Sequence, residues 1–226
     1  MQTSESARAL TTTTCRLAVS EPDRNDVYRL RYECYHRRGA IPADPSERFS
    51  DAFDQQPNHF SFLVAASEAG SSAEEPLGTV RISVVRPDLN WTTSPGAKVF
   101  GDHPTFQAIA AESYVEASRL CFRPQARRDV LYQLVANLVA LADFYEATWL
   151  VACPRVEHSQ IYQRMFGFRP LAAPRQYFGV NFETELLGIR LEEIRTVASG
   201  VRSMAKAWSQ AKALVATSAV VATGMQ

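Results

Sequence analysis

The sequence lacks an excess of either charge. Its 226 residues include 24 Lys+Arg and 24 Asp+Glu, so the formal net charge is zero. Bulk binding to nucleic acid needs a surplus of positive charge that releases counterions, so we do not expect this function, although a local basic patch is compatible with the balance. Hydrophobic residues make up 46% and charged residues 21%, and this composition and length predict one soluble globular domain.

Metal-binding and disulfide patterns are also missing. The sequence contains four cysteines, at Cys15, Cys34, Cys121 and Cys153, and four histidines, at His36, His59, His103 and His158. The cysteines are scattered without a Cys-x-x-Cys pair, which predicts free, unreactive thiols in a cytosolic protein rather than a zinc cluster or a disulfide framework. The histidines have no ligand spacing, so we expect no metal.

Long apolar runs are absent as well. No stretch of about 18 apolar residues is present, which argues against a membrane-spanning helix. The N-terminus reads MQTSESARALTTTT and lacks the apolar core of a signal peptide. We therefore expect neither secretion nor an integral membrane position, and predict a cytoplasmic protein.

The patterns that are present predict a layered α/β domain. We expect a disordered lead-in over residues 1–14, a domain over 15–190, and an amphipathic helix with a tail over 191–226. The expected strands are 15–20, 59–67, 77–86, 113–122, 148–153 and 175–189, the last with a kink at Gly179. The expected helices run from Asp23 or Asn25 to about Arg38, and over 105–111, 123–147, 158–168 and 191–216. Strands that alternate with helices in this order are typical of α/β folds.

Two segments in this order carry a resemblance. One is a strand, a loop of Arg and Gln residues and a long helix, from Val115 to Phe144; the other is a short helix that ends in YQRMFGF (162–168). They resemble the GCN5-related N-acetyltransferase (GNAT) superfamily. The resemblance implies a mixed central sheet flanked by helices, in which two splayed strands form the acyl-pantetheine cleft.

The N-terminal half narrows the resemblance. The run RYECYHRRG (31–39) is followed in order by SDAFD with Asp51 and Asp54, GTVRIS with Arg81, and VEASR with Glu116 and Arg119. Over roughly residues 28–168, this set resembles the acyl-homoserine-lactone synthases and the related long-chain N-acyl amino acid synthases. These enzymes move a fatty acyl chain from acyl carrier protein onto an amine. The resemblance implies an acyltransferase that binds no cofactor of its own and takes the acyl group from the 4'-phosphopantetheine arm of acyl carrier protein.

One departure separates the two groups of enzymes. The autoinducer synthases usually carry a Trp shortly after the Arg-Gly element, where this chain reads GAIP with Ile41. This argues against a pocket for S-adenosylmethionine and favours an N-acyl amino acid synthase, whose best-known relatives use tyrosine as acceptor. Two alternatives stay open. They are an acyl-homoserine-lactone synthase that uses S-adenosylmethionine, and a non-catalytic module that binds carrier protein.

Glu116 is the candidate general base. An ammonium group cannot attack a thioester, so a carboxylate within reach, directly or through water, must take a proton. Otherwise Glu116 is a solvent-facing strand residue. Arg119 lies three positions further, on the opposite face of a regular strand, so both residues can line one site only if the strand is bulged near Ala117–Ser118.

Such a bulge also predicts an opening between the strands 113–122 and 148–153, into which a pantetheine arm can enter. It frees backbone N–H groups near Leu120 and Cys121 to bind the thioester oxygen and stabilise the tetrahedral oxyanion. Tyr162 is the candidate proton donor to the leaving thiolate, as its place in the GNAT pattern implies, or a packed helix residue.

Four charged residues of the N-terminal half are candidates for substrate binding. Asp51 and Asp54 are ordinary loop acids, or hold the ammonium group of the acceptor, or pair with Arg31 and Arg81 to fix the loop. Arg81 lies in an apolar strand, where an unpaired charge is costly, so it needs a carboxylate from the loop or from the acceptor. Arg31 otherwise belongs to a solvated helix face.

The segment RPQARRD begins the long helix. Arg123, Arg127 and Arg128 there are candidates for the phosphate of phosphopantetheine and the acidic face of a carrier protein, or are ordinary surface residues. GNATs that use CoA usually have a glycine-rich loop at this place, and its absence favours carrier protein. The last helix either roofs an acyl channel, covers the sheet or makes weak contact with a membrane surface.

Overall fold

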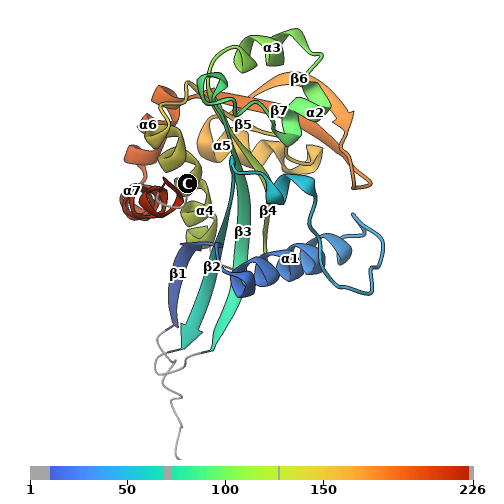
Figure 1. Cartoon of the computed structure of the whole chain (residues 1–226), viewed down its shortest axis with the longest axis vertical. Helices are drawn as coiled ribbons and strands as arrows, with labels where there is room; N and C mark the ends of the chain where they lie inside the picture. Colours follow the sequence, from blue (N-terminus) through green and yellow to red (C-terminus); the bar gives the residue numbers. More distant parts are fainter. Residues whose placement is uncertain (1–10, 69–72, 127, 224–226) are drawn as a thin grey trace, which may run out of the picture.

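The computed structural model describes residues 11–68, 73–126 and 128–223, which fold around one mixed sheet (Figure 1). The strand order is β1-β2-β3-β4-β5-β7-β6, and β4–β5 is the parallel pair among antiparallel neighbours. The strands are β1 (Thr11–Leu17), β2 (His59–Glu68), β3 (Glu74–Val85), β4 (Tyr114–Phe122), β5 (Trp149–Ala152), β6 (Arg169–Gln176) and β7 (Glu183–Arg190). The predicted fold class, a GNAT-like mixed sheet flanked by helices, is confirmed.

Helices cover both faces of the sheet. The α-helices are α1 (Glu21–His36), α2 (Pro95–Phe100), α3 (Pro104–Ala110), α4 (Arg128–Phe144), α5 (Ser159–Phe166), α6 (Leu191–Gly200) and α7 (Arg202–Thr223). Short 3-10 helices span Ala52–Gln55, Pro87–Leu89 and Val156–His158. None of the helices in the described ranges is long and apolar enough to cross a membrane.

The alternation of side chains along β2 shows how the faces divide. Phe62 and Val64 belong to the main core with α4, whereas Leu63 between them packs with α1. The main core also takes in buried residues of α6 and α7, among them Ile194 and Met204. The α4 face is therefore the larger apolar layer, and the α1 face is free to carry polar groups.

The N-terminal boundaries differ from those predicted. Residues 11–14 form part of β1 and pair with β2, so the sheet reaches into the expected lead-in, whose first ten residues lie outside the described ranges. The strand ends at Leu17, and Ser20 caps α1 by accepting a hydrogen bond from Asp23 N at 3.2 Å. Neither Asp23 nor Asn25 is the cap, because Pro22 already occupies the first turn, where proline is favoured.

The C-terminal part corrects two further predictions. The expected strand 175–189 is two antiparallel strands, β6 and β7, because the chain reverses at 177–182, where Gly179 has φ +71°. The expected helix 191–216 is also two helices, separated at Val201 by an extended residue (φ −109°, ψ 111°). The second of them, α7, packs mainly on α4 and reaches the edge strand β1, so it covers the core rather than an acyl channel.

Candidate active site

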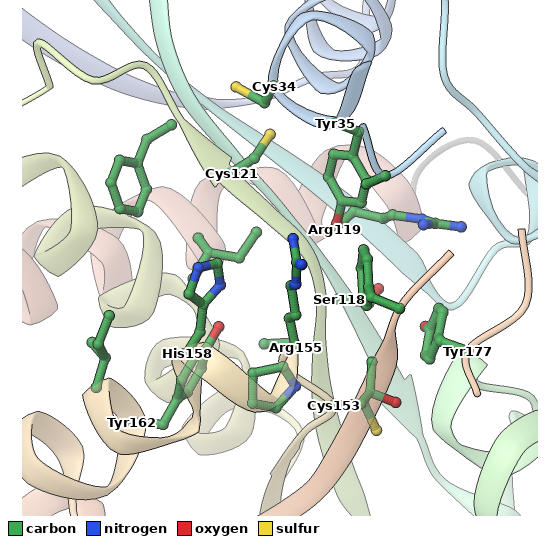
Figure 2. A pocket seen from close by; sticks show the side chains of 18 of the residues that line it. Cys34, Tyr35, Ser118, Arg119, Cys121, Cys153, Arg155, His158, Tyr162 and Tyr177 are labelled. Atoms are coloured by element: carbon green, nitrogen blue, oxygen red, sulfur yellow. The ribbon is translucent and has the colours of Figure 1, made fainter. Parts of the chain in front are cut away.

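A cavity of about 370 Å³ opens between β4 and β5 (Figure 2). This volume falls in the roughly 300–1,000 Å³ range of small-molecule sites. Its walls come from the far half of β4, the chain after β5, and parts of α1, α5 and β7. Most of its surface is apolar.

The cavity exists because the two parallel strands separate. Pairing runs from Tyr114 opposite Trp149 to Ala117 opposite Ala152, where β5 ends. β4 continues to Phe122, and its residues 118–122 form one wall while 153–155 form another. The predicted opening between these strands is confirmed. Beyond Ala117, β4 still pairs with β3, but its other edge, which faces away from β3, has no partner strand among the described residues.

The bulge in β4 is present, but it lies further along the strand than predicted. Thr79 of β3 faces Cys121 and Arg81 faces Ser118, so two steps on β3 match three on β4. Arg119 occupies the extra position with φ +54°, a conformation uncommon outside glycine. Leu120 and Cys121 lie in the cavity wall, as expected for candidate oxyanion donors.

Two rows of polar side chains cross the α1 face of the sheet. One row joins Ser61, Arg81 and Ser118 in register. The next joins His59, Ser83 and Glu116. Cross-strand neighbours lie on the same face of a sheet. These strands are therefore apolar on the α4 face and polar along the two rows on the α1 face.

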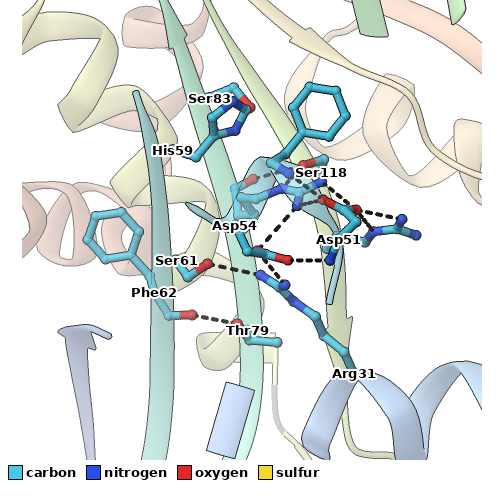
Figure 3. A network of polar contacts seen from close by, with 12 residues as sticks. Arg31, Asp51, Asp54, His59, Ser61, Phe62, Thr79, Ser83 and Ser118 are labelled. Atoms are coloured by element: carbon cyan, nitrogen blue, oxygen red, sulfur yellow. Dashed lines mark hydrogen bonds and ion pairs between the residues drawn. The ribbon is translucent and has the colours of Figure 1, made fainter. Parts of the chain in front are cut away.

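The loop between α1 and β2 supplies carboxylates that pair with the arginine of the first row (Figure 3). Asp51 accepts hydrogen bonds from Arg81 through both carboxylate oxygens, at 2.5 and 3.2 Å, and its Oδ2 also accepts one from Arg119 at 2.8 Å. Asp54 binds Arg31 at 2.7 Å and lies 3.2 Å from Arg81 Nη1. Of the interpretations offered for Asp51 and Asp54, the structure contains the pairing with Arg31 and Arg81 that fixes the loop.

This network occupies the Nη groups of Arg31 and Arg81, while Arg31 Nε is buried without a hydrogen-bond partner among the described residues. Arg31 and Arg81 are completely buried, so the interpretation of Arg31 as a solvated residue is wrong. Burial alone would raise the pKa of Asp51, but the hydrogen bond and charge of Arg81, with those of Arg119, hold it well below its usual value. Three guanidinium groups face two carboxylates, so the cluster keeps one surplus positive charge beside the second row.

Glu116 stands in that second row, fully buried. Both carboxylate oxygens accept hydrogen bonds from Gly96 N, at 2.9 and 2.8 Å. A Cβ atom at position 96 would lie 2.7 Å from Glu116 Oε2, so a larger residue there would displace the carboxylate. Burial raises the pKa of Glu116 to about 7, against hydrogen bonds from Ser94 and Gly96 and the charge of Arg81.

Glu116 does not itself line the cavity. Cys153 and Tyr177 do, and the Glu116 charge adds to the burial that raises the pKa of both. The carboxylate therefore lies close behind the cavity wall. A carboxyl group that titrates near neutrality at such a place is typical of a general base.

Tyr162 lines the cavity from α5, as Figure 2 shows. Burial raises its pKa, with smaller contributions from Tyr35 and Cys153. The hydroxyl thus keeps its proton and can donate a hydrogen bond. The ring also packs edge-on against Phe168, with 5.9 Å between centroids, so Tyr162 is a packed helix residue that also lines the cavity.

The arginines near the start of α4 have different surroundings. Arg123 binds Glu33 at 2.9 Å and Glu75 at 3.0 Å. Arg128 is exposed in the first turn of α4, and Arg127 lies outside the described residues. Arg128 is therefore the accessible cation of this set in the described part of the chain.

Sequence reasoning missed the cavity residues Arg38, Arg155, His158 and Thr184. Arg38 Nη1 lies 3.3 Å from His158 Nε2, although 120 positions separate them. Arg38 belongs to the RYECYHRRG run, which was a usable signal; Arg155 and His158 follow β5 without any recognisable motif. No cluster of three or more metal-ligating side chains occurs in the described ranges.

Comparison with known proteins gives the site its context. The family model of the N-acyl amino acid synthase FeeM matches residues 26–190. The solved structure of FeeM, an N-acyl amino acid synthase from uncultured soil microbes, is 16% identical with a TM-score of 0.66 and covers 83% of this chain and 95% of its own. No curated protein matches the sequence.

Two other solved structures have the same fold. The acyl-homoserine-lactone synthase LasI is 13% identical with a TM-score of 0.58, over 85% of this chain and 96% of its own. A putative N-acetyltransferase from Lactobacillus plantarum is 15% identical with a TM-score of 0.54, over 80% of this chain and 99% of its own. At these identities the structures establish the fold alone.

Proposed function

Because the chain belongs to the FeeM family of N-acyl amino acid synthases, and is thus an acyltransferase, we propose that it moves a long-chain fatty acyl group from acyl carrier protein to the α-amine of an amino acid, with tyrosine as acceptor. The observation that carries this proposal is the opening between β4 and β5, which ends in a largely apolar cavity. Such an opening accepts a narrow pantetheine arm and the lipid tail attached to it.

The reaction joins nitrogen to the thioester carbon and releases sulfur. The acceptor amine loses a proton to Glu116 through a water molecule, because Glu116 lies behind the cavity wall. The neutral amine attacks, and the N–H groups of the unpaired edge near Leu120 and Cys121 bind the oxyanion. The C–S bond then breaks, and Tyr162 donates a hydrogen bond to the leaving thiolate. The nitrogen loses its second proton, which passes through water to this thiolate and gives the free thiol, and Glu116 returns the first proton to solvent.

The polar network has a supporting role in this scheme. Its surplus positive charge favours ionised Glu116, since the charge of Arg81 lowers the Glu116 pKa. It also holds the loop that carries Asp51 against β3 and β4. Arg119, bound to Asp51 and stacked 4.3 Å from the Phe49 ring, keeps the bulge in place.

The donor assignment rests on the surface near α4. The segment RPQARRD offers the exposed Arg128 but no glycine for close wrapping of a pyrophosphate. This favours acyl carrier protein over CoA, and hence a cytoplasmic reaction. Arg128→Glu is expected to raise KM for dodecanoyl-carrier protein about tenfold and to leave KM for tyrosine unchanged.

The test of the function is a competition among acceptors. Purified protein is given dodecanoyl-carrier protein with an equimolar mixture of amino acids and S-adenosylmethionine, and the products are weighed by mass spectrometry. We expect N-dodecanoyl-tyrosine as the main amide. Dodecanoyl-homoserine lactone as main product would instead identify an autoinducer synthase, and binding of carrier protein without any amide would identify a non-catalytic module.

A further inference from the structure

The cavity contains a cationic corner that the proposed chemistry does not use. Arg38 follows α1, Arg155 follows β5, and His158 ends the 3-10 helix before α5. Figure 2 shows the Arg155 side chain extending into the cavity beside His158. Burial and the charges of Arg38 and Arg155 lower the pKa of His158, so the two guanidinium groups supply the charge of this corner.

This charge is not balanced from inside the cavity. None of the described residues that line it is Asp or Glu, and Arg119 is already bound to Asp51 on the network side. Glu157 lies outside the cavity wall and pairs with Arg155 Nε at 2.8 Å, and its side chain is 63% exposed. The two Nη groups of Arg155 have no hydrogen-bond partner among the described residues. Guanidinium donors that face a cavity without a partner call for an acceptor.

Thr184 of β7 adds a second unpaired donor at the same place. It forms an isolated antiparallel bridge with Arg155, so the two side chains lie on one side of the backbone. Thr184 is 1% exposed and lines the cavity, yet its hydroxyl has no hydrogen-bond partner in the described part of the chain. An Arg and a Thr with free donors side by side form a site for an anion with two or more oxygens.

The place of this corner distinguishes between two anions. Arg155 comes two residues after Cys153, whose thiol is close enough to Glu116 to sense its charge. An anion bound here thus lies near the reacting centre. The phosphate of the donor is separated from the thioester by the whole pantetheine arm, whereas the α-carboxylate of an amino acid is attached to the same carbon as the reacting amine.

We infer that Arg155 and Thr184, assisted by Arg38 and His158, form the subsite for the α-carboxylate of the acceptor. The inference rests on the proposed function for the class of acceptor. It replaces Arg31 and Arg81 in this role, since neither of them lines the cavity and both are paired with the loop acids. The subsite selects amines that carry a neighbouring carboxylate, and so separates amino acids from simple amines.

The test measures binding without turnover. N-dodecanoyl-tyrosine and N-dodecanoyl-tyramine, which differ by the carboxylate, are titrated into the whole protein by calorimetry. The wild type is expected to bind the tyrosine compound at least about tenfold more tightly, as a hydrogen-bonded charge pair implies. Arg155→Gln and Thr184→Val should each reduce this preference, Arg155→Lys should retain part of it, and affinity for the tyramine compound should stay unchanged.

Arg169→Gln is the matched control, because this arginine is 68% exposed on β6, binds Glu193 and does not line the cavity. It should keep the full preference. The inference is overturned if the wild type binds both compounds equally or neither, if Arg155→Gln keeps the preference, or if Arg155→Gln weakens both compounds alike. A wild type that keeps the preference but makes no amide from carrier protein would refute the proposed function and leave the subsite standing.

Discussion

At the scale of single residues, the buried carboxylate of Glu116 connects the fold to the chemistry. It belongs to a polar row of the sheet, accepts hydrogen bonds from Gly96, and has a pKa of about 7 because of burial. A base with this pKa is half ionised at neutral pH, which suits proton transfer from an ammonium group.

The first prediction concerns the pH dependence of the reaction. Because the base must be ionised, kcat/KM should rise about tenfold per pH unit below 7 and level off above it. Glu116→Gln should lower kcat by about 10²–10⁴-fold and abolish this rise. Glu112→Gln, on the same segment but 40% exposed and paired with Arg190, is the control and should keep the wild-type profile. An unchanged profile in Glu116→Gln would show that another group is the base.

The same group predicts a pH-dependent difference in stability. The pKa of Glu116 is higher in the folded protein than its ordinary value of 4.5, so between these values the folded state binds more protons than the unfolded state. Its contribution to the free energy of unfolding therefore falls as pH rises from 4.5 through about 7. In urea titrations, the free energy of unfolding of Glu116→Gln relative to that of the wild type should increase by up to roughly 3 kcal/mol between pH 5 and 8. A constant difference across that range would contradict the assignment.

The ionised carboxylate of Asp51, unlike that of Glu116, is expected to stabilise the folded protein. This carboxylate is the shared partner of Arg81 and Arg119, both buried. Asp51→Asn leaves Arg119 without a counter-ion and Arg81 with Asp54 alone, and should lower the free energy of unfolding by about 3–5 kcal/mol. Asp102→Asn, which removes a 75% exposed partner of Arg175, should change it by less than about 1 kcal/mol, as surface pairs do. Equal effects in chemical denaturation would contradict the role of the network.

At the scale of elements, the separation of β4 from β5 was predictable and its details were not. The spacing of Glu116 and Arg119 requires a bulge if both serve one region, but where the bulge falls depends on how β3 pairs across Thr79 and Arg81. That pairing depends on the tertiary structure, and it places the extra residue of the bulge at Arg119. Similarly, Gly179 was identified as a kink, but only pairing between β6 and β7 shows that the chain reverses there.

The cavity between these elements predicts a change in acyl-chain selection. Ile161 is 43% exposed on α5 and lines the cavity, so Ile161→Trp should narrow it without disturbing the core. The variant should shift the preferred donor toward shorter acyl chains, measured as kcat/KM across C8 to C16 carrier-protein thioesters. Val156→Trp, at a 39% exposed position outside the cavity wall, is the control. A wild-type chain-length profile in Ile161→Trp would mean that the acyl chain lies elsewhere.

Helix α7 has a structural role, which separates it from the cavity. Met204 is 1% exposed in the main core beside α4, and no described residue of α7 lines the cavity. Met204→Ala should therefore cost about 2–5 kcal/mol of unfolding free energy while KM for donor and acceptor stays unchanged. A changed chain-length preference in this variant would instead support a roof over the acyl channel.

At the scale of the whole molecule, the two faces of one sheet divide the tasks. The α4 face is an apolar core shared with α6 and α7, and its pattern in the sequence predicts the architecture. The α1 face holds buried ions and the candidate base, and its charged residues stand out in the sequence as violations of that pattern. Arg38, Arg155 and His158 could not be grouped in advance, because only the completed fold brings segments 120 positions apart together.

The central claim is that the opening between β4 and β5 holds the pantetheine-linked acyl group. The most direct measurement is a crystal structure of the protein with a non-hydrolysable amide analogue of dodecanoyl-pantetheine. We predict that the arm lies along the unpaired edge of β4 beyond Ala117, with its carbonyl oxygen at the N–H groups near Leu120 and its tail in the cavity. An analogue bound outside this opening, with residues 118–122 hydrogen-bonded to the chain that follows β5, would contradict the account.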